Sequence, residues 1–99
     1  MRIELLYFDG CPNWTVVEER LARAMTAAGC EDVTIHRRKV ATAEEAEQVG
    51  FIGSPTIRVD GRDPFAVGEE QVGLACRVYS TPEGLSGSPT VEQLLEALS

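Results

Sequence analysis

The stretch Phe-Asp-Gly-Cys-Pro-Asn-Trp, residues 8–14, decides how this 99-residue chain is interpreted. It follows a run of apolar and aromatic residues, 2–8, that is typical of a short buried strand. It leads into residues 12–28, where apolar residues recur at helical spacing between charged ones. Pro12 suits the first position of that helix, because its missing N–H is not needed there. The sequence therefore places Cys11 in a turn between a strand and the start of a helix.

This position predicts a reactive thiol at Cys11. The unpaired N–H groups and the positive end of the helix dipole stabilise an anion at a helix N-terminus. A thiolate is such an anion, so we expect the pKa of the Cys11 thiol to fall below that of a free thiol. The thiolate is the form that attacks disulfides and binds soft metals. The alternative is a cysteine that only fills space at a helix cap, but burial is not expected at such a turn.

Capping boxes, turn residues and apolar periodicity predict the rest of the fold. The expected order is strand, helix, strand, helix, strand, strand, helix, over residues 2–8, 12–28, 32–40, 42–49, 56–60, 74–79 and 90–98. The first strand, helix and strand can form a parallel crossover, and the last two strands an antiparallel hairpin. The predicted fold class is therefore α/β, with a four-stranded mixed sheet and helices on both faces.

Composition excludes several kinds of function. Nine Lys and Arg against 16 Asp and Glu give a net charge of −7, which argues against nucleic-acid binding. No stretch is apolar for long enough to span a membrane, and the first residues lack the pattern of a signal peptide. An odd count of three cysteines favours thiols in a reducing compartment. We therefore expect one cytoplasmic domain, residues 1–99, with neither nucleic acid nor membrane as a partner.

A second motif, Gly-Ser-Pro-Thr at residues 53–56, stands just before the third predicted strand. A proline at the entry to a strand has no N–H to offer the ladder. A trans bond before Pro55 is the general default. This motif and the Cys11 turn, in this order of elements, occupy the two positions that define the thioredoxin fold.

On these motifs the chain resembles the thioredoxin/glutaredoxin superfamily over essentially its whole length. The resemblance implies a thioredoxin-like fold with Cys11 as the nucleophile and Pro55 as the cis-proline beside it. It implies that the backbone of Ser54 pairs with a bound substrate. Further candidates for substrate contact are Pro12, Trp14 and Thr56, although Trp14 is equally well explained by core packing. More narrowly, the chain is similar to short thioredoxin-like proteins associated with mercury resistance, such as alkylmercury lyase.

The chain departs from the superfamily at the second cysteine of its Cys-x-x-Cys motif. Trp14 stands there, so two thiols cannot pair across one turn of helix. One remaining route is monothiol transfer with glutathione as co-substrate. The other uses Cys76, whose strand at residues 74–79 is expected to return antiparallel toward Cys11. The alternative for Cys76 is a side chain that faces the core, in alternation with Leu74 and Val78.

The sequence thus predicts a thiol–disulfide redox or thiol-transfer protein in which Cys11 and Cys76 react. The expected partners are protein thiols, protein disulfides or glutathione, and no resident cofactor is expected. The cysteine spacings and the single histidine, His36, match no usual metal site, and His36 is expected to face solvent. Two alternatives stay open: a thioredoxin-like binding module without activity, and a carrier that holds mercury or copper between two thiolates.

Overall fold

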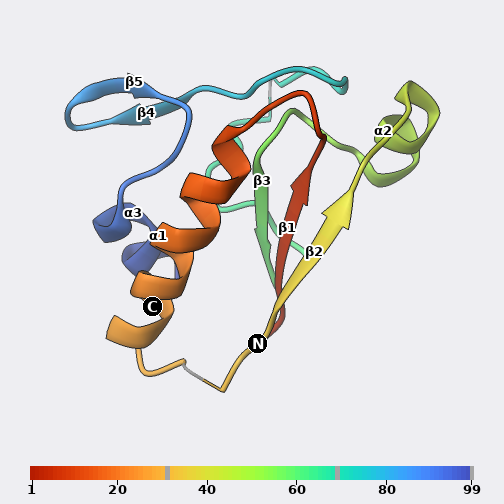
Figure 1. The fold of residues 1–99 in the computed structure, drawn as a ribbon. Coiled ribbons are helices and arrows are strands. Elements are labelled where there is room, and N and C mark those ends of the chain that lie inside the picture. The colour runs from red at the N-terminus through yellow and green to blue at the C-terminus, as the bar shows by residue number, and fades with distance from the viewer. Residues whose placement is uncertain (31, 69, 99) are drawn as a thin grey trace.

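The computed structural model describes residues 1–30, 32–68 and 70–98 of the chain. Its elements, in chain order, are β1 (Ile3–Tyr7), α1 (Asn13–Ala27), β2 (Ile35–Lys39), α2 (Ala43–Val49), β3 (Thr56–Val59), β4 (Tyr79–Thr81), β5 (Gly84–Ser86) and α3 (Val91–Ala97) (Figure 1). All of the predicted helices are present. Among the described residues, no helix is both long and apolar enough to cross a membrane.

The main sheet has three strands in the order β2-β1-β3. The central strand β1 is parallel to β2 and antiparallel to β3, so Ile3 lies opposite both Ile35 and Val59. The predicted parallel crossover through α1 and the mixed character of the sheet are both confirmed.

The predicted four-stranded sheet is wrong. Residues 74–78 do not form a strand beside β3, and β4 pairs instead with β5, a strand that the sequence did not reveal, in a separate two-stranded hairpin. The turn at Asp60-Gly61 brings Arg62 back to a bridge with Val59. Pro64 follows two residues later and has no N–H for a ladder, so the chain leaves the edge of β3 there.

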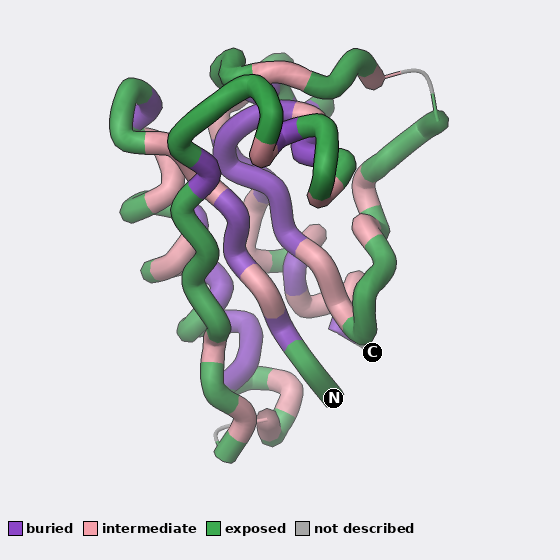
Figure 2. The backbone as a smooth tube through the Cα atoms, turned by 90° about the vertical axis from the view of Figure 1, so that its right-hand side faces the viewer, coloured by how far each residue is buried: buried purple, intermediate pink, exposed green. Residues whose placement is uncertain are grey.

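Helices cover both faces of the sheet, as predicted. Successive side chains of β1 point to opposite faces, so Leu5 and Leu6 enter two different cores. The larger core lies between the sheet and the α1–α3 pair, and the smaller one joins Leu6 to α2 through Ala46. Figure 1 shows α1 and α2 on opposite sides of the strands, and Figure 2 shows β1, traced from the N-terminus, running through the buried interior.

The predicted caps of α2 and α3 are found in large part, with only one half of the predicted capping box at Thr42, whereas α1 begins at Asn13 with Pro12 as its N-cap and not as its first helical residue. The Thr42 hydroxyl accepts a hydrogen bond from the Glu45 N–H at the start of α2. Thr90 and Gln93 form the expected reciprocal capping box at the start of α3. Gly50 closes α2 with φ of 67°, a left-handed conformation that suits glycine. These local signals therefore set where the helices lie along the chain.

Candidate thiol site

The two sequence motifs lie side by side in the structure. The turn after β1 carries Cys11 to the start of β3, where the Ser54–Pro55 peptide bond is cis. The Cys11 thiol donates a hydrogen bond to the Ser54 carbonyl oxygen at 3.4 Å. The backbone N–H of Phe8 donates to the Ser54 hydroxyl at 3.3 Å. Ser54 thus holds the turn at both its backbone and its side chain.

A third segment, residues 73–79, completes the site, and we call it the strap. The Ser54 N–H donates to the Ala75 carbonyl at 2.8 Å, and the Arg77 N–H donates to the Ser54 carbonyl at 2.8 Å. These two bonds form a parallel bridge that sets Cys76 opposite Ser54. In Figure 1 the strap crosses the end of the molecule where β1 ends and β3 begins.

The strap brings the Cys76 thiol to the Cys11 thiol. A side-chain hydrogen-bond interaction with Cys11 is the largest cause that raises the pKa of Cys76, followed by burial and by an electrostatic interaction with Cys11. The expected antiparallel approach is wrong, since the contact comes from the parallel bridge. The core-facing alternative for Cys76 is also wrong, because Cys76, Leu74 and Val78 are exposed.

Burial of Cys11 corrects a second expectation. Its exposed fraction is 0%, whereas the turn alone indicated an accessible thiol. The ring of Phe8 folds back over Gly10 so closely that a Cβ on Gly10 would lie 2.4 Å from a ring carbon. The thiol itself lies against the Ser54 carbonyl, 43 positions away in sequence. The sequence of the turn alone could not reveal a contact with so distant a segment, so it did not predict the burial of Cys11.

Arg77 anchors the strap. Its guanidinium forms a 2.5 Å ion pair with Asp63, and the exposed fractions of the two side chains are only 6% and 9%. It also lies 4.5 Å from the centroid of the Tyr79 ring. The Tyr79 hydroxyl donates to the Pro55 carbonyl, and burial raises the pKa of Tyr79. Sequence analysis missed these anchors, although a lone arginine in the apolar run 74–79 was a usable signal.

Glycine at position 53 permits the close approach of the strap. Its φ of +118° is one that residues with a side chain rarely adopt. A Cβ there would lie 3.1 Å from the Arg77 Cβ and 3.2 Å from the Ala75 carbonyl oxygen. The residue before the Ser54-Pro55 pair therefore has to lack a side chain for the strap to reach Ser54.

The other predicted contact residues lie around the site in different ways. Pro12 is exposed at the N-cap of α1. Trp14 is half-buried, stacks on Tyr7 with ring centroids 4.4 Å apart, and packs against the α1–α3 core. The buried Thr56 hydroxyl donates to the Gly53 carbonyl at 2.6 Å. Trp14 and Thr56 thus make contacts within the fold.

The superfamily resemblance implies that the Ser54 backbone pairs with a substrate, but in this structure that backbone already pairs with the strap. Both its N–H and its carbonyl oxygen are bonded to the strap. A substrate could pair with this backbone only after the strap had left. Substrate pairing at Ser54 is therefore not available in the arrangement that the structure describes.

The remaining cysteine and histidine lie apart from this contact. Cys30 is half-buried and packs against the larger core, and His36 is exposed on β2, as expected. Within residues 1–30, 32–68 and 70–98, no three His, Cys, Asp or Glu side chains gather as a metal site. A metal held here would have only the two thiols of Cys11 and Cys76 as clustered ligands.

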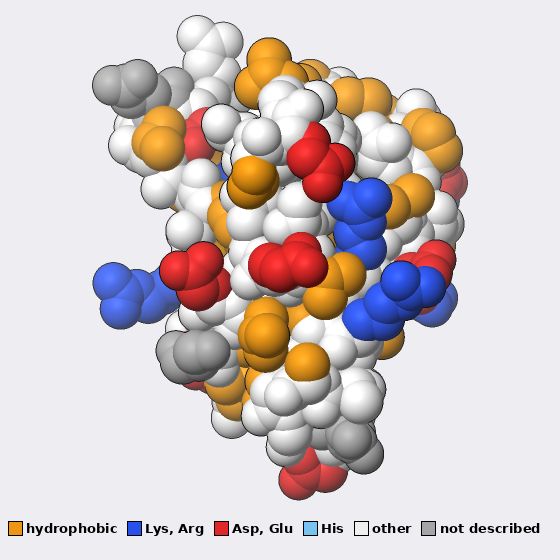
Figure 3. Space-filling view, turned by 90° about the vertical axis from the view of Figure 1, so that its left-hand side faces the viewer, with side chains coloured by type: hydrophobic (Ala, Val, Ile, Leu, Met, Phe, Trp, Pro, Cys, Tyr) orange, Lys and Arg blue, Asp and Glu red, His pale blue; other side chains and the backbone are white. Residues whose placement is uncertain are grey.

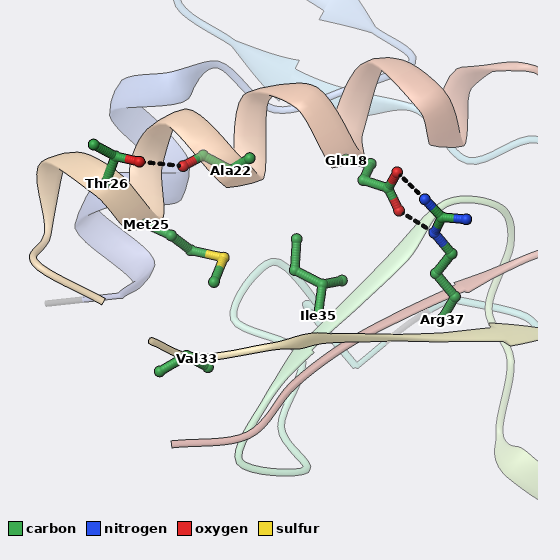
Figure 4. A pocket seen from close by; sticks show the side chains of 7 residues that line it. All are labelled: Glu18, Ala22, Met25, Thr26, Val33, Ile35 and Arg37. Carbon is green, nitrogen blue, oxygen red and sulfur yellow. Dashed lines mark hydrogen bonds and ion pairs between the residues drawn. The ribbon is translucent and has the colours of Figure 1, made fainter. Parts of the chain in front are cut away.

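A groove of about 820 Å³ lies between α1 and β2, away from the thiol pair (Figure 4). Its walls are Glu18, Ala22, Met25, Thr26, Val33, Ile35 and Arg37. An ion pair between Glu18 and Arg37 crosses one end and raises the pKa of Arg37. On the face shown in Figure 3, apolar side chains lie among acidic and basic ones. The lining of the groove includes no cysteine, so the thiol pair is the better candidate for thiol chemistry.

Comparison with known proteins finds no match for this chain. No family model matches the chain, and neither a curated protein nor a solved structure matches it. The superfamily resemblance therefore stays a hypothesis, and function has to be argued from the thiol pair itself.

Proposed function

We propose that this chain is a thioredoxin-like thiol–disulfide redox protein whose working pair is Cys11 and Cys76. The observation that carries the proposal is that both cysteines lie against Ser54, although they are 65 positions apart in sequence: the Cys11 thiol donates to the Ser54 carbonyl, and a parallel bridge sets Cys76 opposite Ser54. Two thiols in contact are the reduced form of a disulfide, provided that their backbones lie within about 7 Å of each other. The strap bridge beside Ser54 supports such an approach.

The proposed chemistry is a reversible two-electron exchange. The thiolate of one cysteine of the pair attacks a substrate disulfide, so a mixed disulfide forms and one substrate thiolate leaves. The thiolate of the other cysteine then attacks the sulfur of the cysteine that carries the substrate. A Cys11–Cys76 bond forms, the bond to the substrate sulfur breaks, and the rest of the substrate leaves as a second thiolate. Cys76 thereby supplies the second thiol that this chain lacks at the last position of Cys-x-x-Cys.

The binding-module alternative has less support at this position. A module that recognises an extended peptide through Ser54 needs free backbone groups there, and the strap uses both. The contact between two thiols has no part in such recognition, whereas it is required for a disulfide. We therefore place redox exchange first.

The test is oxidation of the purified protein in glutathione buffers of graded potential, followed by intact mass and peptide mapping. We expect a loss of two hydrogens that maps to a Cys11–Cys76 bond. Cys30→Ser is the matched control and should titrate as the natural chain does, because Cys30 lies apart from the pair. Cys11→Ser and Cys76→Ser should both lack the two-hydrogen loss. If no buffer converts the natural chain, the redox proposal is wrong.

A soft-metal carrier is the second candidate, and the same pair of thiols favours it. Two thiolates suit a thiophilic ion such as mercury or copper(I), and no third His, Cys, Asp or Glu gathers with them in the described parts of the chain. Titration with each ion, read by native mass spectrometry in reducing conditions, tests this. One ion bound by the natural chain and by Cys30→Ser, but by neither Cys11→Ser nor Cys76→Ser, would support the carrier.

A further inference from the structure

The two thiols of the pair differ sharply in their access to solvent. Cys11 has an exposed fraction of 0%, whereas Cys76 is exposed on the strap. Attack on a disulfide requires the incoming thiolate to reach one particular sulfur. A small thiol in solution can reach the sulfur of Cys76 directly. It can reach the sulfur of Cys11 only if the strap or the turn opens.

From this difference we infer that an external low-molecular-weight thiol forms its mixed disulfide on Cys76, and that Cys11 is the buried partner that leaves and returns. The inference rests on the proposed function and gives it a direction. It reverses the assignment in which the cysteine at the helix start meets the substrate first.

The strap makes opening at Cys11 unfavourable. It is held by two backbone hydrogen bonds to Ser54 and by the buried ion pair between Arg77 and Asp63. The Tyr79 hydroxyl bonded to the Pro55 carbonyl adds a further anchor. Opening of the strap has to break these contacts together, which makes that route to Cys11 unfavourable.

The reaction is balanced in two steps. The thiolate RS⁻ attacks the sulfur of Cys76 in the oxidised protein, so an R–S–Cys76 bond forms and the Cys11–Cys76 bond breaks. The electron pair of the broken bond leaves with Cys11 as its thiolate. A second RS⁻ attacks the sulfur atom that carries R in the mixed disulfide, which releases RSSR and the Cys76 thiolate. Two RSH are oxidised, their two protons pass to the cysteines, and the protein gains two electrons.

The decisive experiment traps the intermediate in the oxidised Cys30→Ser protein. Reduced glutathione is added, the reaction is stopped with acid at a series of times, and free thiols are labelled with N-ethylmaleimide after unfolding. We expect an intermediate with glutathione on Cys76 and the maleimide on Cys11. The opposite pattern of labels would overturn the inference and leave the proposed redox pair standing.

Single variants in the same background give a second measurement. We expect glutathione disulfide to modify Cys76 in Cys11→Ala at least roughly ten-fold faster than Cys11 in Cys76→Ser, because Cys11 reacts only from opened molecules. Equal rates, measured while circular dichroism shows both variants folded, would also overturn the inference. If Cys30→Ser never forms the Cys11–Cys76 bond and only accumulates glutathione on Cys76, the proposed function fails, and the leaving step fails with it.

Discussion

Replacing Arg77 with methionine should cost far more stability than a change at a surface arginine. The side chains of Arg77 and Asp63 are 6% and 9% exposed and form a 2.5 Å ion pair. Removing one partner of a buried pair costs about 3–5 kcal/mol, because the other charge stays buried without compensation. A domain of this size has a free energy of unfolding of roughly 5–15 kcal/mol, so about a fifth or more of it would be lost.

Urea denaturation followed by circular dichroism measures this loss. With an m-value of about 1.5 kcal/mol/M, a loss of about 3 kcal/mol lowers the midpoint by roughly 2 M. The matched control is Arg23→Met, which removes an ion pair with Glu19 whose two side chains are both 67% exposed. Such exposed pairs contribute about 0–1 kcal/mol, so the control midpoint should fall by under about 0.7 M.

A double variant separates charge burial from lost packing. Asp63→Asn keeps an oxygen that can accept the hydrogen bond from the Phe65 N–H, at 2.9 Å in the structure, and removes the charge. Added to Arg77→Met, it should restore about 1–3 kcal/mol, because no unpaired carboxylate remains buried. The reasoning is refuted if Arg77→Met costs no more than Arg23→Met. It is also refuted if Asp63→Asn destabilises the Arg77→Met protein further.

Three more predictions address the strap and the pair. Gly53→Ala should lower the free energy of unfolding by about 2 kcal/mol in urea denaturation, because φ is +118° and the strap is too close, whereas Gly73→Ala, with nothing within 4 Å, should change it little. Cys11→Ala should move the pH profile of Cys76 alkylation to lower pH, since contact with Cys11 is what raises that pKa; an unchanged profile would contradict the thiol contact. Burial raises the pKa of Tyr79 above its unfolded value of about 10, so stability is fully present below that pH and is lost as pH rises beyond it. Unfolding midpoints at pH 9 to 11 should show that loss, with a smaller slope in Tyr79→Phe.

Local signals in the sequence predicted most of the fold. Each of these signals depends on contacts between residues no more than four positions apart. They are the Thr42 and Thr90 caps, the glycine after α2 and the turn before Arg62, and each is found where expected. The apolar run of residues 2–8 predicted a buried strand, and Ile3, Leu5 and Leu6 of β1 are buried. Such signals depend on backbone groups close by, which a single sequence displays directly.

The strap could not be predicted in the same way. Leu74 and Val78 alternate like residues of a half-buried strand, yet both are exposed. What holds this segment is the Arg77–Asp63 pair and the Ser54 backbone, contacts whose partners are 14 and 23 positions away. The alternation of apolar residues therefore led to the wrong prediction of a strand. The segment is held in place by one buried ion pair and two backbone hydrogen bonds, and not by burial of its apolar side chains.

The Ser54 carbonyl links the two halves of the site. It accepts hydrogen bonds from the Arg77 N–H and from the Cys11 thiol, so one oxygen holds both the strap and the buried cysteine. A peptide that paired with Ser54 would have to displace the strap, and Cys76 would then move away from Cys11. A Cys11–Cys76 disulfide would in turn tie the strap over Ser54 and exclude the peptide. A Cys11–Cys76 disulfide and peptide binding at Ser54 are therefore mutually exclusive in this architecture, and oxidation would lock in place the strap that already covers Ser54 in the reduced protein.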